Sequence, residues 1–443
     1  MKNRLEIDIN LPSIIKFTLP SMIMMLIVSV YTIIDGMFVS RLIGTDAFSA
    51  VNIVFPTMSF NIALGTMFGT GITAIVSRKL GEGHKKEANE NFTFVALAAF
   101  IMGTAFSAFC IIFIEDVIYF LGANEEIYDY CYDYALPIFL FFGAEILQLV
   151  FQSVYVADGK PGIGLGITVA GGVVNAVLDY VFIAKVHMGI AGAAVATGLG
   201  YLLCALFGLV YFALNRKGNV MFVRFKPQWR VLIFSAVNGS SELVSSLSVS
   251  ITTLLFNIIM MHFAGQEGVA AISILLYLDF ILMALVFGYS MGIAPLFSFN
   301  YGKKDDLRIK QLFKNSTALI VFFEAAVTAL AVIFSGELTA IIAEKGSHVY
   351  DMAVAGLKIY AISYLFKGYS EFTSAMFTAF ENGKVSALLS FMRTLVLLSA
   401  AIVIMAYLFG VNGVWWSTPV AEGIAVIMAM YFIFRYRKVY GYL

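Results

Sequence analysis

Long apolar runs recur along almost the whole chain, and they constrain its fold more than any other feature of the sequence. Twelve of them have the length of about 20 residues that an α-helix needs to cross the hydrocarbon core of a bilayer. Only 13% of the 443 residues are charged, against about 25% in soluble domains. The sequence therefore predicts an all-α polytopic membrane protein with transmembrane helices at residues 14–36, 47–76, 92–114, 131–155, 162–184, 190–214, 231–258, 269–299, 313–335, 352–380, 385–409 and 412–434.

The loops between these expected helices alternate in charge. Lys and Arg are frequent in the N-terminal segment, in the loops after the second, sixth and eighth helices, and in the C-terminal tail. The opposite side has few cations, chiefly Arg41, Lys185 and Lys345, and its loop at residues 115–129 is acidic. Because cytoplasmic loops are enriched in Lys and Arg, we expect both termini to be cytoplasmic.

The second half of the chain repeats the first at an offset of 221 residues. Residues 41–53 align with 262–274 without a gap, and Gly81 aligns with Gly302. Six helices return the chain to the side on which it began, so the halves are expected to be parallel six-helix repeats, an architecture that transporters use. We expect an N-terminal lobe at 1–214, a cytoplasmic linker at 215–230 and a C-terminal lobe at 231–443.

Polar residues within two of the expected helices need an explanation. Asn175 and Asp179 are four residues apart and therefore share one face of helix 162–184. A carboxylate near the middle of a spanning helix costs about 2.5–3.5 kcal/mol on insertion scales. At the offset of 221 these residues, and Asp35 of the first helix, align with apolar residues, so packing does not require them. A functional role is favoured; alternatively, Asp35 is solvated at its helix end and Asp179 bonds a neighbouring helix.

Other polar residues suggest a substrate cavity. Glu145, Gln148 and Gln152 form a stripe on helix 131–155 that we expect to face the cleft of the transporter. Glu242, in the seventh helix, is either a carboxylate for a cation or a substrate, or a residue on the wet wall of the inner cavity.

Charged residues deep in the second half receive no transport role. Lys367 and Glu371 are four residues apart on one expected helix, a spacing that favours an ion pair. Glu324, Arg393 and Glu422 are also deep, and one of them can neutralise another, whereas Asp279 is left unassigned.

Several motifs of this chain resemble those of the MATE (multidrug and toxic compound extrusion) family over nearly its whole length. They are "FTLPSMI" and "IIDGMFVSRLIG" in the first helix, "SRKLGEG" after the second, "DGKPGIGLGI" and "NAVLDYVFI" in the fifth, and "GIAGAAVAT" entering the sixth. The resemblance implies a multi-pass, ion-coupled exporter of the bacterial cytoplasmic membrane.

The DinF-like branch of that family implies particular residues. Its helix-1 Asp, helix-5 Asn and Asp, and helix-6 Thr form a cation-coupling site, and the matching residues here are Asp35, Asn175, Asp179 and Thr197. Its first helix bends during transport at a proline 15 residues before the Asp, a spacing that Pro20 reproduces. The NorM-like branch instead has acids in the second half, but this chain reads "SSLSVS" at that branch's helix-7 Glu.

This residue set suits two coupling ions. Two close carboxylates in a low dielectric cannot both ionise cheaply, so the pair can take up a proton outside and release it inside. The four residues also supply four hard oxygen atoms for Na⁺, the only metal that we expect. H⁺ is preferred because no further oxygen ligand is evident, and no cofactor is expected.

The function expected from these features is export of lipophilic, mostly cationic drugs or metabolites by alternating access, carried out by a monomer in the bilayer. The alternative within the same superfamily, a flippase for lipid-linked sugars, would favour a cationic cavity, whereas the deep residues here are mainly acidic. An enzyme is not indicated, because the four histidines lie at helix ends or in loops and the sequence has no HExxH motif. It has no GxxxxGK[ST] motif for ATP either, so transport is expected to run on an ion gradient. The net charge of zero gives no reason to expect a nucleic-acid partner.

Overall fold

The computed structural model describes residues 3–443, without the side chains of Ile34, Met37, Ser40, Arg41 and Thr45. The prediction that Arg41 is one of the few cations on the side opposite the termini therefore falls on a side chain outside the described residues. Regular structure in the described range is helical throughout, with no strand. In chain order the elements are α1 (Leu11–Leu42), α2 (Thr45–Gly81), α3 (Lys85–Ile112), α4 (Ile114–Phe120), α5 (Glu125–Leu140), α6 (Phe142–Ala157), α7 (Pro161–Asp179), η1 (Tyr180–Lys185), α8 (Gly189–Leu214), α9 (Trp229–Gly302), α10 (Asp306–Ile333), α11 (Ser335–Ala340), α12 (His348–Tyr360), η2 (Ala361–Ser363), α13 (Tyr364–Ala379), α14 (Gly383–Phe391), η3 (Met392–Leu397) and α15 (Leu398–Tyr440).

These elements form the twelve membrane-crossing segments expected from the sequence. Nine continuous helical segments of the described chain are long and apolar enough to span a bilayer, and α5 with α6, bent by 53°, makes a tenth. Two of the nine are broken by a glycine, α9 at Gly265 (φ 61°, ψ −153°) and α15 at Gly410 (φ 59°, ψ −138°). Each break divides one segment into two spans. Glycine adopts such positive φ angles at no steric cost.

The glycine at the second break also reveals the repeat. Gly189, which aligns with Gly410 at the offset of 221, has a φ of 60°, nearly that of its counterpart. In the first half this glycine begins a separate helix, α8, whereas in the second half the helix resumes directly after it. The same backbone turn therefore stands at the same place in both repeats.

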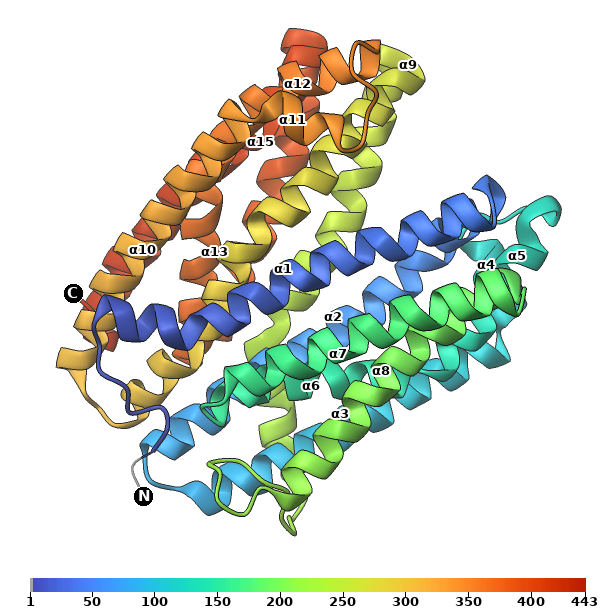
Figure 1. The fold of residues 1–443 in the computed structure, drawn as a ribbon. Coiled ribbons are helices and arrows are strands. Elements are labelled where there is room, and N and C mark those ends of the chain that lie inside the picture. The colour runs from blue at the N-terminus through green and yellow to red at the C-terminus, as the bar shows by residue number, and fades with distance from the viewer. Residues whose placement is uncertain (1–2) are drawn as a thin grey trace.

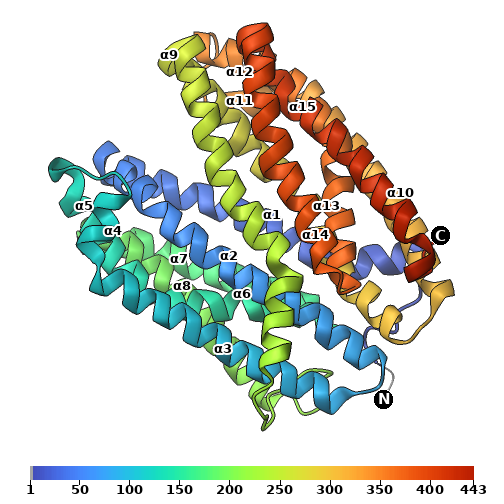
Figure 2. The same cartoon turned by 180° about the vertical axis from the view of Figure 1, so that it is seen from behind.

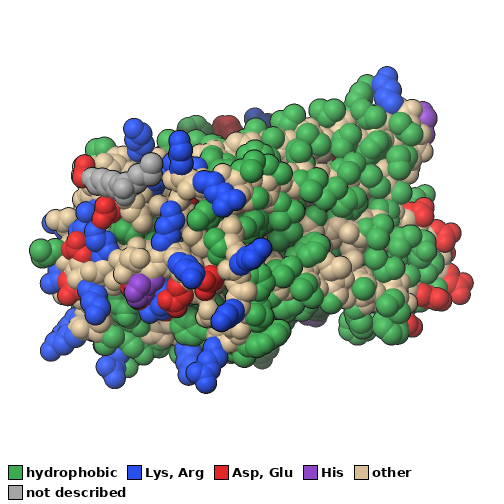
Figure 3. Space-filling model, turned by 90° about the horizontal axis from the view of Figure 1, so that it is seen from below, with side chains coloured by type: hydrophobic (Ala, Val, Ile, Leu, Met, Phe, Trp, Pro, Cys, Tyr) green, Lys and Arg blue, Asp and Glu red, His purple; other side chains and the backbone are tan. Residues whose placement is uncertain are grey.

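Figures 1 and 2 show two groups of helices that lie against each other near the chain termini and diverge toward the opposite end. The first helix group contains α1–α8, and the second helix group contains α9–α15. A broad hydrophobic band separates an end covered with Lys and Arg from an end where Asp and Glu gather (Figure 3). This distribution agrees with the alternation of charge in the loops.

The two groups approach each other closely through glycines. A Cβ atom at Gly81 would lie 2.1 Å from the carbonyl oxygen of Phe299, and one at Gly302 would lie 2.1 Å from that of Arg78. Phe299 and Arg78 are themselves 221 residues apart, so the two contacts are equivalent across the repeat. An ion pair between Arg78 Nε and Glu381 Oε1 (2.8 Å) joins the groups beside them.

The segment between α8 and α9 is attached to the first helix group. The buried Asp158 carboxylate, just after α6, accepts hydrogen bonds from the backbone N–H groups of Asn219 (2.6 Å) and Val220 (2.8 Å). On α3, Asn89 Oδ1 accepts from the N–H of Met221 (3.0 Å). Side chains of the first group thus replace the backbone partners that this irregular segment lacks.

Candidate functional site

The four residues predicted for cation coupling lie together inside the first helix group. Asp35 comes from α1, Asn175 and Asp179 from α7, and Thr197 from α8. Asn175 Nδ2 donates a hydrogen bond to Thr197 Oγ1 (3.2 Å), and the carboxyl groups of Asp35 and Asp179 are neighbours. Asp179 is the last residue of α7, where the chain widens into the π-helical turn η1. Such turns are frequent at functional sites.

The acidic pair is poor in hydrogen-bond donors. Asp179 is fully buried, and neither of its oxygens has a hydrogen-bond partner among the described residues; the same holds for Asp35 Oδ1. An ionised carboxylate offers acceptors only, and a buried charge without a partner is costly. A proton or another small cation between the two groups would satisfy these oxygens.

A third carboxylate lies near this pair. Glu145 of α6, predicted to face a substrate cavity, is 1% exposed and accepts a hydrogen bond from Asn61 Nδ2 of α2 (2.6 Å). It interacts electrostatically with three tyrosines that also face Asp35, namely Tyr31, Tyr134 and Tyr201. The first helix group therefore holds three carboxyl groups, those of Asp35, Asp179 and Glu145, near the same three tyrosines.

The other two residues of the predicted polar stripe lie further along α6. Gln152 is buried, and its Nε2 is 3.4 Å from Thr168 Oγ1 of α7, whereas Gln148 is half-buried. The predicted role of Gln148 and Gln152 in a substrate cavity therefore stays a prediction.

Deep charged residues of the second helix group are arranged differently, because cations and carboxylates pair. Lys367 Nζ on α13 contacts both carboxylate oxygens of Asp279 on α9 (2.8 and 2.6 Å). Arg393 on η3 pairs with Glu371 on α13 and with Glu422 on α15, the latter at 3.4 Å. The ion pair expected between Lys367 and Glu371 is therefore wrong: each residue has a partner on a neighbouring helix instead of on its own.

Two more acids of this group have different surroundings. Glu324 Oε1 on α10 accepts the backbone N–H of Tyr369 (2.7 Å), which is a structural contact. Glu242 on α9 is half-buried and interacts electrostatically with Glu371 and Arg393, but it has no ion pair within 4 Å among the described residues. Glu242 is thus an acid of this region without a direct counter-ion.

Comparison with known proteins identifies the family. The MatE family model matches residues 20–181 and 243–409. The chain belongs to the MatE family. The "Multidrug export protein MepA" of Staphylococcus saprophyticus is 25% identical over 426 residues, 95% of this chain and 93% of the relative. MepA of Staphylococcus haemolyticus is 23% identical over 432 residues, with the same coverage of both chains.

Solved structures share the fold of this MATE chain. A MATE protein in complex with MaL6 superposes with a TM-score of 0.94 over 99% of both chains at 22% identity. An outward-facing "multidrug resistance MATE family transporter of the MOP superfamily" superposes with a TM-score of 0.93, over 99% of this chain and 98% of the other, at 22% identity. This MATE chain is accordingly a multi-pass membrane protein of a transporter family with bacterial relatives.

The first helix of this MATE chain contains the proline expected at a bend. Pro20 lies inside α1, which is helical from Leu11 to Leu42. It lacks the N–H that would bond the carbonyl of Lys16, and this weakens the helix locally. Bending of α1 during transport stays a prediction.

Some neighbours of the predicted coupling residues were not found from the sequence, although a signal for two of them exists. Tyr31 precedes Asp35 by four residues and Tyr201 follows Thr197 by four, the spacing that places each on the same helix face as its partner. Asn61 is one of two asparagines in the apolar helix α2, and neither it nor Tyr134 has a comparable signal. Among the described residues, no three or more His, Cys, Asp or Glu side chains are arranged to hold a metal ion.

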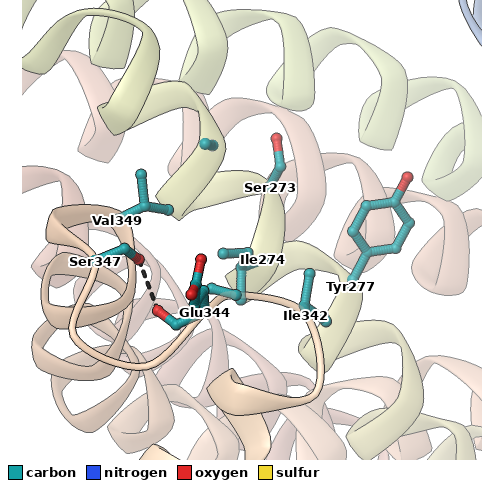
Figure 4. Close-up of a pocket in the computed structure, with 9 residues that line it drawn as sticks. Ser273, Ile274, Tyr277, Ile342, Glu344, Ser347 and Val349 are labelled. Atoms are coloured by element: carbon teal, nitrogen blue, oxygen red, sulfur yellow. Dashed lines mark hydrogen bonds between the residues drawn. The ribbon is translucent and has the colours of Figure 1, made fainter. Parts of the chain in front are cut away.

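A separate pocket of about 370 Å³ lies on the second helix group (Figure 4), and Figure 1 shows the elements that form it at the end away from the termini. It is formed by α9 and the segment between α11 and α12, with Ser273, Tyr277 and Glu344 in its wall. The contact inside it, from Ser347 Oγ to the carbonyl oxygen of Glu344 (2.8 Å), stabilises a turn. The residues predicted for cation coupling are not among those that line this pocket.

Proposed function

We propose that this chain is a cation-coupled antiporter that exports lipophilic, mostly cationic drugs or metabolites by alternating access. The observation that carries the proposal is the Asp35–Asp179 pair inside the first helix group, in which three carboxyl oxygens have no hydrogen-bond donor among the described residues. An acidic pair of this kind holds a cation when it faces outward and releases it when it faces inward. The relatives named as multidrug export proteins support the export of small molecules.

The coupling ion in this proposal is H⁺, with Na⁺ as the alternative. The orphaned carboxyl oxygens favour a proton, since one proton shared between them removes the repulsion of two buried charges. The neighbouring Asn175 and Thr197 oxygens keep Na⁺ as a testable alternative.

Alternating access would move an N-terminal lobe (1–214) against a C-terminal lobe (231–443), joined by a linker (215–230). The close glycine contacts near the basic end support closure of the described conformation at that end. By the charge of the loops, the basic end and both termini are cytoplasmic. The transporter would then bind its coupling ion from the opposite, acidic side, as a monomer in a bacterial cytoplasmic membrane.

The charges of the second helix group support organic cations as substrates over lipid-linked sugars. A pyrophosphate group would need a free cation in the cavity, but Lys367 and Arg393 each contact carboxylates. Glu242, without a direct counter-ion, is the carboxylate that we assign to substrate binding. A catalytic role or a cofactor is not part of this proposal.

Dye efflux in inverted membrane vesicles tests the function. A proton gradient, acidic inside, or a sodium gradient is imposed in turn, and accumulation of a cationic dye is recorded. We expect the proton gradient to drive accumulation in vesicles with the protein and not in vesicles without it. Accumulation driven by neither gradient would overturn the proposal, and accumulation driven by sodium alone would replace the coupling ion.

A further inference from the structure

The carboxyl group of Glu145 is buried with fewer hydrogen-bond donors than its oxygens can accept. Its Oε2 accepts a hydrogen bond from Asn61 Nδ2 (2.6 Å), and the Tyr201 hydroxyl faces the carboxyl group as a second donor, but no donor among the described residues lies within 3.5 Å of its buried Oε1. Asn61 is itself fully buried, and its Oδ1 likewise lacks a partner. Two neighbouring side chains thus leave acceptor atoms open in a site closed to bulk water.

The orientation of the Asn61 amide is fixed by the backbone. Asn61 Nδ2 also donates to the carbonyl oxygen of Phe142 (3.1 Å), and a carbonyl can only accept. The amide therefore points its NH₂ group toward Glu145 in either protonation state of the carboxyl group. Asn61 positions the carboxyl group without neutralising it.

No cation is paired with Glu145 in the described part of the chain. The ionisable groups that face it are Tyr31 of α1, Tyr134 of α5 and Tyr201 of α8, with Asp35 of α1 beyond the same tyrosines. By contrast, Arg78 and Arg393 contact the buried carboxylates Glu381 and Glu422. A buried carboxyl group without a counter-ion can change its charge only by binding a small cation.

One tyrosine lies near both Glu145 and the acidic pair. The Tyr134 hydroxyl interacts electrostatically with Asp35, Glu145 and Asp179, and its hydrogen bond is to the weak acceptor Met58 Sδ (3.6 Å).

We propose that Glu145 is a second proton-binding site of the first helix group, so that the transporter exchanges two protons for one monovalent organic cation. This inference rests on the proposed function, in which the Asp35–Asp179 pair exchanges one proton. Two protons against one monovalent cation move one net charge across the membrane per cycle, whereas one proton against one cation moves none.

The stoichiometry is measured from the limiting accumulation of ethidium, a monovalent cation, in proteoliposomes under an imposed gradient of one pH unit. At zero membrane potential the wild type should reach a ratio of about 100-fold and Glu145→Gln about 10-fold, because each exchanged proton contributes one factor of ten. A potential of about 60 mV should shift the wild-type ratio by roughly tenfold and leave the variant unchanged.

Two variants serve as controls. Glu324→Gln removes another buried carboxylate, 3% exposed, which is bonded to the Tyr369 backbone and lies in the other helix group; it should keep the wild-type ratio. Glu145→Asp keeps an ionisable group and should retain the response to potential.

The outcomes separate this inference from the proposed function. A wild-type ratio of 10-fold without a response to potential overturns the inference even where Glu145→Gln fails to insert. A variant that inserts and keeps both the 100-fold ratio and the response to potential also overturns it. If a pH gradient drives no wild-type accumulation at all, the proposed proton coupling fails first.

Discussion

The acids around Asp179 in the first helix group and those around Arg393 in the second differ in their counter-ions. In the first group, Asp35, Asp179 and Glu145 have no cationic partner among the described residues, whereas in the second group Lys367 and Arg393 contact their acidic neighbours. A carboxylate beside a fixed cation stays charged through a transport cycle. A carboxylate without one changes its charge when it binds a proton. The ion-paired cluster of the second group therefore keeps its charge, and we infer that the acids around Asp179 in the first group exchange theirs.

The largest expected effect comes from breaking the fixed charges. Arg393→Met leaves Glu371 and Glu422 as uncompensated charges, and removing one partner of a buried ion pair destabilises by about 3–5 kcal/mol. We expect this loss in the free energy of unfolding, measured by denaturant titration of the purified protein in detergent. Asp179→Asn should not lower the free energy of unfolding, because it removes a charge that has no cation.

A matched control sharpens that contrast. Combining Arg393→Met with Glu371→Gln and Glu422→Gln removes the cation together with its acids and should recover most of the lost stability. If Arg393→Met and Asp179→Asn destabilise the protein equally, the two helix groups do not differ in the way described.

A smaller effect is expected at the acid of the second group that lacks a direct partner. Glu242→Gln removes one charged contact to a cationic substrate, worth about 1.5–3 kcal/mol for a hydrogen bond to a charged group. The apparent affinity for cationic substrates should fall by roughly tenfold to a hundredfold, while ion-driven transport of a neutral substrate stays measurable. The measurement is the concentration dependence of efflux for one cationic and one neutral dye. Loss of all transport would instead assign coupling to both halves.

The smallest of these effects is expected at the partner of Asp179. Asp35 is half-buried and nearer the acidic end of its helix, so a neutral Asp35→Asn should weaken coupling less than the change at Asp179. We expect the dye accumulation ratio of Asp35→Asn to be roughly tenfold lower than that of the wild type, as if the imposed pH gradient were smaller by about one unit. Dye accumulation under an imposed pH gradient measures it. Unchanged coupling in this variant would restrict the site to α7.

Local sequence features predicted the membrane-spanning helices, whereas the ion pairs and the neighbours of the acids depend on how those helices pack. Apolar runs of spanning length specify a membrane helix by themselves, which is why the twelve segments could be predicted. The spacing of Lys367 and Glu371 is also local, but it predicted a wrong pair, because Asp279 and Arg393, distant in sequence, lie closer in space. Asn61 and Tyr134 could not be found from the sequence, since their place beside the acids depends on how α2 and α5 pack against α6.

The central claim is that the acidic pair of the first helix group couples ion movement to export, and Asp179→Asn tests it most directly. Wild type and variant are reconstituted in equal amounts, and ethidium accumulation is followed under a pH gradient and, separately, under a sodium gradient. The account predicts that the variant inserts and folds but accumulates no dye above protein-free liposomes under either gradient. Accumulation at the wild-type level by the folded variant would contradict it.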